Sequence, residues 1–346
     1  MTPPRALTET KAALRADPLV WTITGVAGFI GSSLLEALLG LGQTVVGIDN
    51  FVTGSPANLA DVKERVGQAW TRFRFVDGDI VDPEACREVC VGANVVLHHA
   101  ALGSVPRSVA DPIATNNANV GGFVNICVAA RDAGVSRLVY ASSSSVYGDD
   151  PSLPKLESRL GRPLSPYAVS KLANELYAGA FARAFDLPSI GLRYFNVFGR
   201  RQSPEGPYAA VIPRWIASQL RGESCVIYGD GETSRDFCYV ENVVQANLLS
   251  ATCPTAAIGE VFNVAVGQRT TLNNLHQLLW DVVAPHAKTS HMPQPVYAPR
   301  RQGDILHSEA DIRKASEILG YAPTHDVSAG LAETTDWYCR VLKPAS

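Results

Sequence analysis

A tyrosine and a lysine four residues apart form the pair of side chains with the clearest chemical potential. Tyr167 and Lys171 follow Ser165-Pro166, a pair typical of a helix start, so they lie one turn apart on one helix face. A phenol with a pKa of about 10 is a poor base at neutral pH. A nearby positive charge favours the phenolate. We therefore expect Tyr167 to transfer a proton, with the Lys171 ammonium lowering its pKa.

A run of serines upstream supplies hydroxyl groups to the same place. Residues 142–145 are all serine, and they stand at the end of a strand expected over 137–142. Ligands of parallel α/β sheets bind at the carboxyl ends of the strands. Because a tyrosine and a lysine at this spacing often occur by chance, their position downstream of the serine run gives the pair its functional meaning.

Three glycines near the N-terminus form a second candidate site. Gly25, Gly28 and Gly31 are spaced G-x-x-G-x-x-G between a strand expected over 19–24 and a helix expected over 30–41. Such glycines permit a tight turn and a close approach to a pyrophosphate, and the helix N-terminus offers free N–H groups. The pattern predicts a dinucleotide site.

A carboxylate follows at the spacing that a dinucleotide site requires. Asp49 ends a strand expected over 44–49, about 20 residues after the glycines. It would accept a hydrogen bond from the ribose 2′-hydroxyl and repel a 2′-phosphate, so the sequence favours NAD over NADP. Asp79-Ile80, after a third strand over 73–76, could contact the adenine.

These motifs require a parallel sheet to position them. Strands and helices alternate along the first half of the chain, which predicts right-handed βαβ crossovers and a Rossmann-type, doubly wound α/β sheet. After Asn196, short strands and prolines indicate a smaller α/β lobe. We expect an NAD-binding domain over 1–195, with an N-terminal arm over 1–18, and a substrate lobe over 196–346 that is interleaved with it near 237–265. Further strands are expected over 94–98, 189–193 and 261–264, the last able to rejoin the main sheet, and helices over 113–133 and 167–185.

Composition excludes several other functions. The 346 residues carry 30 Lys+Arg against 33 Asp+Glu, a net charge of −3, without a basic block, so nucleic acid and anionic membranes are not expected partners. No apolar run reaches the roughly 18 residues of a membrane span. The seven scattered cysteines and His98-His99 show no metal-ligand spacing, so we expect no metal and a cytoplasmic protein with reduced thiols.

Together, these motifs resemble the extended short-chain dehydrogenase/reductase family, and within it the UDP-hexose 4-epimerases. The resemblance continues through the segments 193–199, 231–237 and 301–304. It implies that Tyr167 removes the proton of the sugar 4-hydroxyl while Ser143 shares the hydrogen bond, and that bound NAD takes the C4 hydride and returns it to the other face. The nucleotide is then held firmly and the sugar loosely.

The resemblance also assigns binding roles along the chain. It places the cofactor on Gly25, Gly28, Phe29, Ile30, Gly31, Asp49, Asn50, Asp79, Ile80, Ala100, Ala101, Tyr167 and Lys171. It places the UDP-sugar on Gly103, Ser143, Ser144, Ser145, Asn196, Gln202, Ala210, Arg235, Arg301, Asp304 and Ser308, with the arginines on the diphosphate. By analogy with relatives, the helices over 113–133 and 167–185 would form a four-helix homodimer interface.

Related chemistries differ in the residues that come directly after Ser143. Dehydratases of nucleotide sugars carry an Asp and a Glu where this chain has Ser144 and Ser145, and uronate decarboxylases carry a Glu in this loop. Simple reductases exchange their cofactor, and some prefer a basic residue in place of Asp49. A non-catalytic NAD-binding regulatory protein would typically have lost Tyr167 or Lys171. These comparisons favour an epimerase.

The identity of the sugar depends on small residues. The segment 100–108 resembles that of bacterial UDP-N-acetylglucosamine 4-epimerases of polysaccharide pathways. Gly103 and Ser308 stand where relatives often carry bulkier side chains, and small residues leave room for an acetamide. We expect interconversion of UDP-GlcNAc and UDP-GalNAc, with UDP-glucose/UDP-galactose and a UDP-uronic acid as alternatives.

Overall fold

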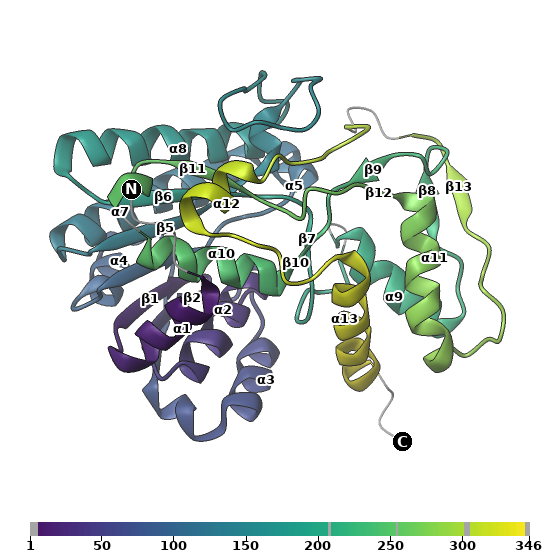
Figure 1. Cartoon of the computed structure of the whole chain (residues 1–346), viewed down its shortest axis with the longest axis horizontal. Helices are drawn as coiled ribbons and strands as arrows, with labels where there is room; N and C mark the ends of the chain where they lie inside the picture. The colour runs from purple at the N-terminus through teal and green to yellow at the C-terminus, as the bar shows by residue number, and fades with distance from the viewer. Residues whose placement is uncertain (1–5, 207–208, 254, 301–304, 343–346) are drawn as a thin grey trace.

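The computed structural model describes residues 6–206, 209–253, 255–300 and 305–342. A seven-stranded sheet is its central layer (Figure 1), in the order β3-β2-β1-β4-β5-β6-β11, and all neighbouring strands are parallel. The predicted Rossmann-type fold is therefore confirmed, including the return of the strand expected over 261–264. The strands are β1 (Val20–Thr24), β2 (Thr44–Asp49), β3 (Phe73–Asp77), β4 (Val95–His98), β5 (Arg137–Ser143), β6 (Ser189–Tyr194) and β11 (Val261–Val264).

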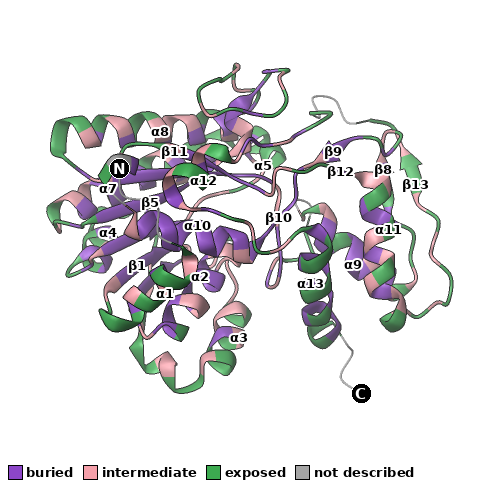
Figure 2. Cartoon of the chain, in the orientation of Figure 1, coloured by how far each residue is buried: buried purple, intermediate pink, exposed green. Residues whose placement is uncertain are grey.

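Helices cover both faces of this sheet, which is why most of its strands are buried along nearly their whole length. Figure 2 shows buried residues along the strands and on the inward sides of the helices. One face carries α2 (Phe29–Gly40), α10 (Val240–Thr252) and α12 (Arg313–Leu319), with α1 (Leu7–Ala16) against α10 and α3 (Pro56–Val66) against α2. The other face carries α4 (Pro83–Cys90), α7 (Gly122–Asp132) and α8 (Pro166–Phe185).

Helix α8 begins where the sequence indicates. The Ser165 side chain accepts a hydrogen bond from the Ala168 N–H, and Pro166 occupies the first helical position, where its missing N–H costs nothing. The helix ends at Asp186, whose φ of 54° is left-handed. The tyrosine and lysine of the motif are therefore in the first two turns of a capped helix.

The helix expected over 113–133 is interrupted, which corrects that prediction. The structure has α6 (Pro112–Asn116), a π-helical turn (Asn117–Gly121), and then α7. Within this turn, Asn119 accepts a hydrogen bond from the Leu102 N–H, and its amide donates to the Leu102 carbonyl and to Ser170 Oγ. The wider turn accompanies these tertiary bonds, which helical periodicity does not reveal.

The remaining elements form a smaller lobe with its own apolar core, built around Trp215, Ile227, Leu275, Leu279 and Tyr338. The chain leaves this lobe for α10 and β11 and later returns to it. Its helices are α9 (Val211–Arg221), α11 (Leu272–Val283) and α13 (Val327–Val341), and its short strands are β7 (Val197–Phe198), β8 (Val226–Tyr228), β9 (Ser234–Arg235), β10 (Cys238–Tyr239), β12 (Thr270–Thr271) and β13 (Val296–Ala298). The shorter helical elements of the chain are α5 (Val105–Ala110) and the 3₁₀ turns Gly67–Arg72, Ser144–Tyr147, Thr255–Ala257 and Ala284–His286.

The described part of the chain contains no helix that is both long and apolar enough to cross a membrane.

Candidate active site

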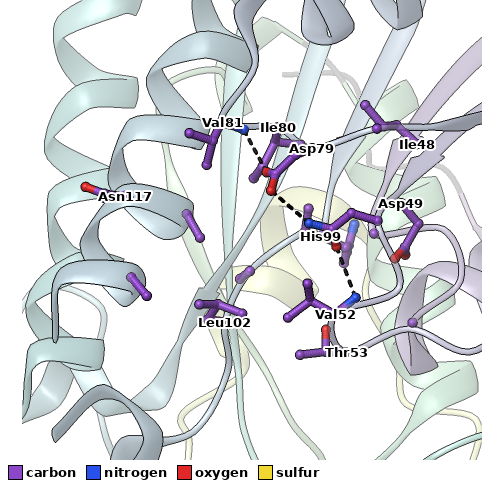
Figure 3. Close-up of a pocket in the computed structure, with 18 residues that line it drawn as sticks. Ile48, Asp49, Val52, Thr53, Asp79, Ile80, Val81, His99, Leu102 and Asn117 are labelled. Atoms are coloured by element: carbon purple, nitrogen blue, oxygen red, sulfur yellow. Dashed lines mark hydrogen bonds between the residues drawn. The ribbon is translucent and has the colours of Figure 1, made fainter. Parts of the chain in front are cut away.

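A cavity of about 450 Å³ opens at the carboxyl ends of β1 to β4. The strand order reverses between β1 and β4, and ligands of doubly wound sheets bind at such a reversal. Figure 3 shows side chains from the ends of β2, β3 and β4 and from the π-helical turn gathered around this space. Predicted cofactor residues in its lining are Gly25, Gly28, Asp49, Asn50, Asp79, Ile80, Ala100 and Ala101.

The glycine loop has the close backbone packing that a pyrophosphate site needs. Gly25 has a φ of +70°, and a Cβ built on it would lie 2.8 Å from the Ala100 nitrogen. A Cβ on Gly31 would lie 2.1 Å from the Gly25 carbonyl oxygen. Phe29 and Ile30 form the first turn of α2, where N–H groups lack helical partners. The loop thus fits a dinucleotide.

Asp49 lines the cavity with a nearly buried carboxylate. Its Oδ2 accepts a hydrogen bond from the Ala27 N–H (2.9 Å), and its Oδ1 accepts one from the Phe51 N–H (2.8 Å). Burial raises the pKa of this carboxyl, and the N–H bonds oppose that rise. Each oxygen retains acceptor capacity beyond these bonds, which is what a ribose hydroxyl would use.

Asp79, labelled in Figure 3, and Asn50 both line this cavity and are bonded to each other. Asn50 Nδ2 donates to Asp79 Oδ2 (2.9 Å), and the Val81 N–H donates to Asp79 Oδ1 (2.9 Å). Asp79 is exposed, so these hydrogen bonds fix the conformation of the loop after β3 without burying the carboxylate. Both residues therefore line the same cavity as Asp49.

Tyr167 and Ser143 come together at the end of β5. The phenol is half-buried, and burial raises its pKa, while a hydrogen bond with Ser143 lowers it. A hydrogen bond that lowers the pKa of a phenol is one donated to its phenolate. Ser143 Oγ also accepts from the N–H (3.1 Å) and the hydroxyl (2.9 Å) of Ser145, which leaves its own hydrogen for Tyr167.

Lys171 makes a contact that sequence reasoning did not anticipate. Its Nζ donates to the Ala141 carbonyl oxygen (2.8 Å), and burial lowers its pKa to about 8. A hydrogen bond with Ser143 lowers the pKa of Tyr167 in this structure, and the effect expected of Lys171 on that phenol stays a prediction. The lysine is thus a buried cation fixed to strand β5, one turn beyond Tyr167.

This burial predicts a measurable pH dependence of stability. Between pH 8 and the ordinary lysine pKa of 10.5, Lys171 is protonated more fully in the unfolded chain than in the folded chain. The free energy of unfolding of the parent therefore increases with pH in this range. A Lys171→Met variant lacks this titration. Its stability relative to the parent should be about 2 kcal/mol more favourable at pH 7 than at pH 10. Urea unfolding of both NAD-free proteins tests this, and an equal difference at both pH values would contradict it.

A second cavity, of about 220 Å³, lies in the smaller lobe. Asn196 and Arg235 line it, as do Arg214, Trp215 and Tyr228. Arg235 Nη1 donates to the Ser234 and Leu306 carbonyls, and Asn196, with a φ of 33°, donates from Nδ2 to the Asp236 carbonyl. The structure therefore brings together an arginine and an amide that the sequence suggested for the diphosphate.

Arg214 is a lining residue that the sequence reasoning missed. It is an exposed cation on the otherwise largely apolar helix α9, and it faces the same cavity as Arg235. Its position as an isolated charge between Pro213 and Trp215 is the sequence feature that could have identified it as a binding residue. Two arginines at one cavity suit a dianionic diphosphate.

The other predicted substrate residues are more dispersed. Gly103 is exposed, and a Cβ built on it would meet no atom within 4 Å. Ser308 is buried, with its N–H donating to the Ser234 carbonyl (3.1 Å). Ala210 adjoins Ala209 and Val211, which line the second cavity. Gln202 is held elsewhere: its Nε2 donates to the Val197 carbonyl, and its backbone carbonyl accepts from the Tyr338 hydroxyl. Arg301 and Asp304 lie outside the described residues.

The two histidines after β4 have structural partners. His98 Nδ1 bonds Thr24 Oγ1 (2.9 Å), and His99 Nε2 bonds the Tyr194 hydroxyl (2.8 Å). Burial lowers the pKa of His99 to about 3, so it is neutral at physiological pH. His99 also lines the first cavity, as a rigid neutral wall.

Comparisons with known proteins agree with this geometry. The NAD dependent epimerase/dehydratase family matches residues 21–265. A UDP-glucose 4-epimerase of Mycolicibacterium smegmatis is 37% identical over 91% of this chain and 97% of its own length. A solved UDP-N-acetylglucosamine 4-epimerase of Methanobrevibacter ruminantium, in complex with UDP-N-acetylmuramic acid, is 37% identical with a TM-score of 0.85, covering 94% of this chain and 99% of that one. A Bacillus cereus UDP-glucuronic acid 4-epimerase, bound to UDP-glucuronic acid and NAD, is 30% identical with a TM-score of 0.82, covering 94% and 100%.

Proposed function

Because this chain belongs to the NAD dependent epimerase/dehydratase family, we propose that its two cavities serve one reaction, the 4-epimerisation of a UDP-sugar, with UDP-GlcNAc and UDP-GalNAc as the preferred pair. The observation that carries the proposal is the cluster of Tyr167, Ser143 and Lys171 at the end of β5. That strand neighbours β4, whose end lines the dinucleotide cavity.

The cluster can move one proton between a sugar hydroxyl and the protein. NAD, when bound, accepts the hydride from the sugar C4 and returns it, and its positive ring favours the Tyr167 phenolate. Tyr167 takes the proton of the 4-hydroxyl, and Ser143 holds the same oxygen by a hydrogen bond. Lys171, fixed on the Ala141 carbonyl, keeps a positive charge behind the phenol. Tyr167 gives the proton back when the hydride returns.

The smaller lobe would hold the nucleotide while the sugar turns. Arg214 and Arg235 present cations to a single cavity, and an arginine fork suits phosphate oxygens. Loose contacts to the sugar then allow the keto sugar to present its other face. We propose this division between a sheet domain over 1–195 and a substrate lobe over 196–346, in a cytoplasmic protein.

Elimination of water is disfavoured by the residues beside Ser143. Ser144 and Ser145 occupy the positions where dehydratases carry carboxyl groups, and Ser145 Oγ is bonded to Ser143. An alcohol with its ordinary pKa does not replace a carboxylic acid as proton donor or acceptor at neutral pH. The site therefore supports proton transfer at one oxygen, as epimerisation requires.

Space near the sugar supports an N-acetyl substrate. A Cβ built on Gly103 meets no atom within 4 Å, and Ser308 carries a small side chain where a large aromatic one would take up more of the sugar site. The test is kcat/KM for UDP-GlcNAc, UDP-glucose and UDP-glucuronic acid, with product analysis. Higher kcat/KM for UDP-GlcNAc supports the proposal, and equal or better turnover of either other sugar contradicts the preference.

A single substitution tests the role of Ser308. Ser308→Tyr should lower kcat/KM for UDP-GlcNAc by about 10- to 100-fold while leaving UDP-glucose within a few-fold, because the phenol would fill the acetamide space. Ser308→Ala is the matched control and should leave both values near those of the parent. An unchanged ratio in Ser308→Tyr would remove Ser308 from the specificity argument.

We also propose a homodimer through α6 and α8. Apolar side chains stand in solvent on these helices, among them Ile113 (73% exposed), Val169 and Leu176 (67%). Exposed apolar side chains grouped on adjacent helices are typical of subunit contacts. Leu176→Asp should convert a dimer to a monomer in light scattering, whereas Val91→Asp, at an equally exposed site on another surface, should not. A parent protein that is already monomeric would refute the dimer.

A further inference from the structure

A buried ion pair joins the helix that carries Tyr167 to the two strands beneath it. Glu175 of α8 and Arg193 of β6 form a two-pronged contact, with Nε on Oε1 (2.9 Å) and Nη2 on Oε2 (2.8 Å). Both side chains are less than 8% exposed. Such a pair contributes little to stability on its own, because the desolvation of two charges offsets their attraction. Stability alone therefore does not explain why this ion pair lies between α8 and β6.

Glu175 continues the spacing of the catalytic pair. Tyr167, Lys171 and Glu175 follow one another at intervals of four residues, which places them on one face of α8. Two of them contact neighbouring residues of β5: Lys171 donates to the Ala141 carbonyl, and Glu175 accepts from Ser142 Oγ (2.5 Å). The next residue of the strand, Ser143, is the side chain that lowers the pKa of Tyr167. The helix is thus attached to the strand directly before Ser143.

Arg193 extends this attachment to the serine loop. Its Nη1 donates to the hydroxyl of Tyr147 (3.1 Å) and to the Glu157 carbonyl (3.1 Å), and its guanidinium lies 5.0 Å from the centre of the Tyr147 ring. The Tyr147 hydroxyl in turn donates to Asn263 Oδ1 of β11 (2.6 Å). Tyr147 ends the 3₁₀ turn that holds Ser144 and Ser145. One guanidinium therefore fixes both sides of the site, since Glu175 lies on the helix and Tyr147 in the loop.

We propose that the Glu175–Arg193 pair is a positioning pair, which sets the register of α8 against β5 so that the Tyr167 hydroxyl meets Ser143. Neither residue contacts the reacting atoms in this arrangement. The pair acts through Ser142 and Tyr147, which adjoin Ser143 and the serine loop. The inference deepens the proposed function and rests on Tyr167 being its proton acceptor.

Glu175→Gln is the primary test. The amide keeps the shape of the side chain, but its nitrogen would face the Arg193 donors and the charge that pairs the guanidinium is lost. We expect kcat to fall on the order of 10- to 100-fold, as for a small misplacement of a reacting group, with KM for the UDP-sugar changed by no more than a few-fold. The exposed Glu88→Gln, which removes the same charge from the Arg74–Glu88 pair, is the control and should leave kcat near the parental value.

A second variant separates positioning from stability. Glu175→Met combined with Arg193→Met removes both charges together, and such replacements of buried ion pairs are often neutral in stability. We expect this variant to fold with an unfolding temperature near that of the parent and still to lose kcat. Parental kcat in either variant, measured below its unfolding temperature, would overturn the proposal.

A readout without turnover distinguishes failure of this inference from failure of the proposed function. The ionisation midpoint of Tyr167 can be followed as the ultraviolet difference between each protein and its Tyr167→Phe derivative across a pH titration. Loss of the Ser143 contact should move this midpoint to higher pH in Glu175→Gln but not in Glu88→Gln. An unmoved midpoint refutes the positioning role even if the parent converts no UDP-sugar.

Discussion

Tyr167→Phe is expected to lower kcat by about 10²- to 10⁴-fold, the largest effect of any conservative change in this chain. The variant removes one oxygen, the only part of the ring that exchanges a proton in the proposed reaction. Because the substitution removes only the hydroxyl and retains the ring and the helix, NAD content and KM should change little. The measurements are single-substrate kinetics and the absorbance of NAD released from the purified protein.

The pH profile provides an independent check of this role. Burial raises the pKa of Tyr167, so the phenolate is scarce at neutral pH and parental kcat should rise with pH. The residual activity of Tyr167→Phe should lack that rise. Tyr177→Phe, ten residues on along α8 and partly exposed, is the matched control and should keep both the rate and the pH profile. A Tyr167→Phe variant with more than a tenth of parental kcat would exclude the phenol as the base.

Asp49→Asn is expected to weaken NAD binding by about 10- to 100-fold, the range expected for hydrogen bonds to a charged group. The asparagine is close in size, but its amide nitrogen would face either the Ala27 or the Phe51 N–H, both of which now donate to the carboxylate. One backbone donor would lose its acceptor, and the negative charge beside the ribose would disappear. Titration calorimetry on NAD-stripped protein measures the affinity.

The same variant should alter the choice between cofactors. Without the carboxylate, the repulsion of a 2′-phosphate is lost, so the ratio of NADP to NAD affinity should rise. Asp281→Asn is the control, because Asp281 is an exposed carboxylate of α11 that does not line this cavity. It should change NAD affinity by no more than a few-fold. Equal losses in the two variants would show that Asp49 has no special role at the ribose.

Much of the fold and part of the site could be predicted from local spacing. The alternation of apolar strands and helices predicted the parallel sheet, because a strand buried on both faces is mostly apolar. The glycine loop and Asp49 were identifiable since both lie beside predicted strand ends, which meet at one edge of such a sheet. Ser165-Pro166 marked the start of α8, because capping depends on neighbours within one helical turn.

Only the tertiary structure decided which groups meet across elements. The periodicity over 113–133 is helical, and the π-helical turn there accompanies the hydrogen bonds of Asn119 to Leu102 and Ser170, from other elements. Likewise, the sequence placed Lys171 one turn from Tyr167, and only the fold shows that its ammonium donates to the Ala141 carbonyl of β5.

The reason is one of distance along the chain. Spacing within a helix or a turn is set by backbone geometry, so the sequence by itself determined the tyrosine–lysine pair, the glycine loop and the strand that ends in Asp49. Contacts between residues far apart, such as Glu175 with Arg193 or Arg214 with Arg235 at one cavity, exist only once the sheet and lobe have packed. Burial likewise shifts the pKa values of Lys171 and His99, because the cost of holding a charge depends on the surrounding protein as well as on the residue type.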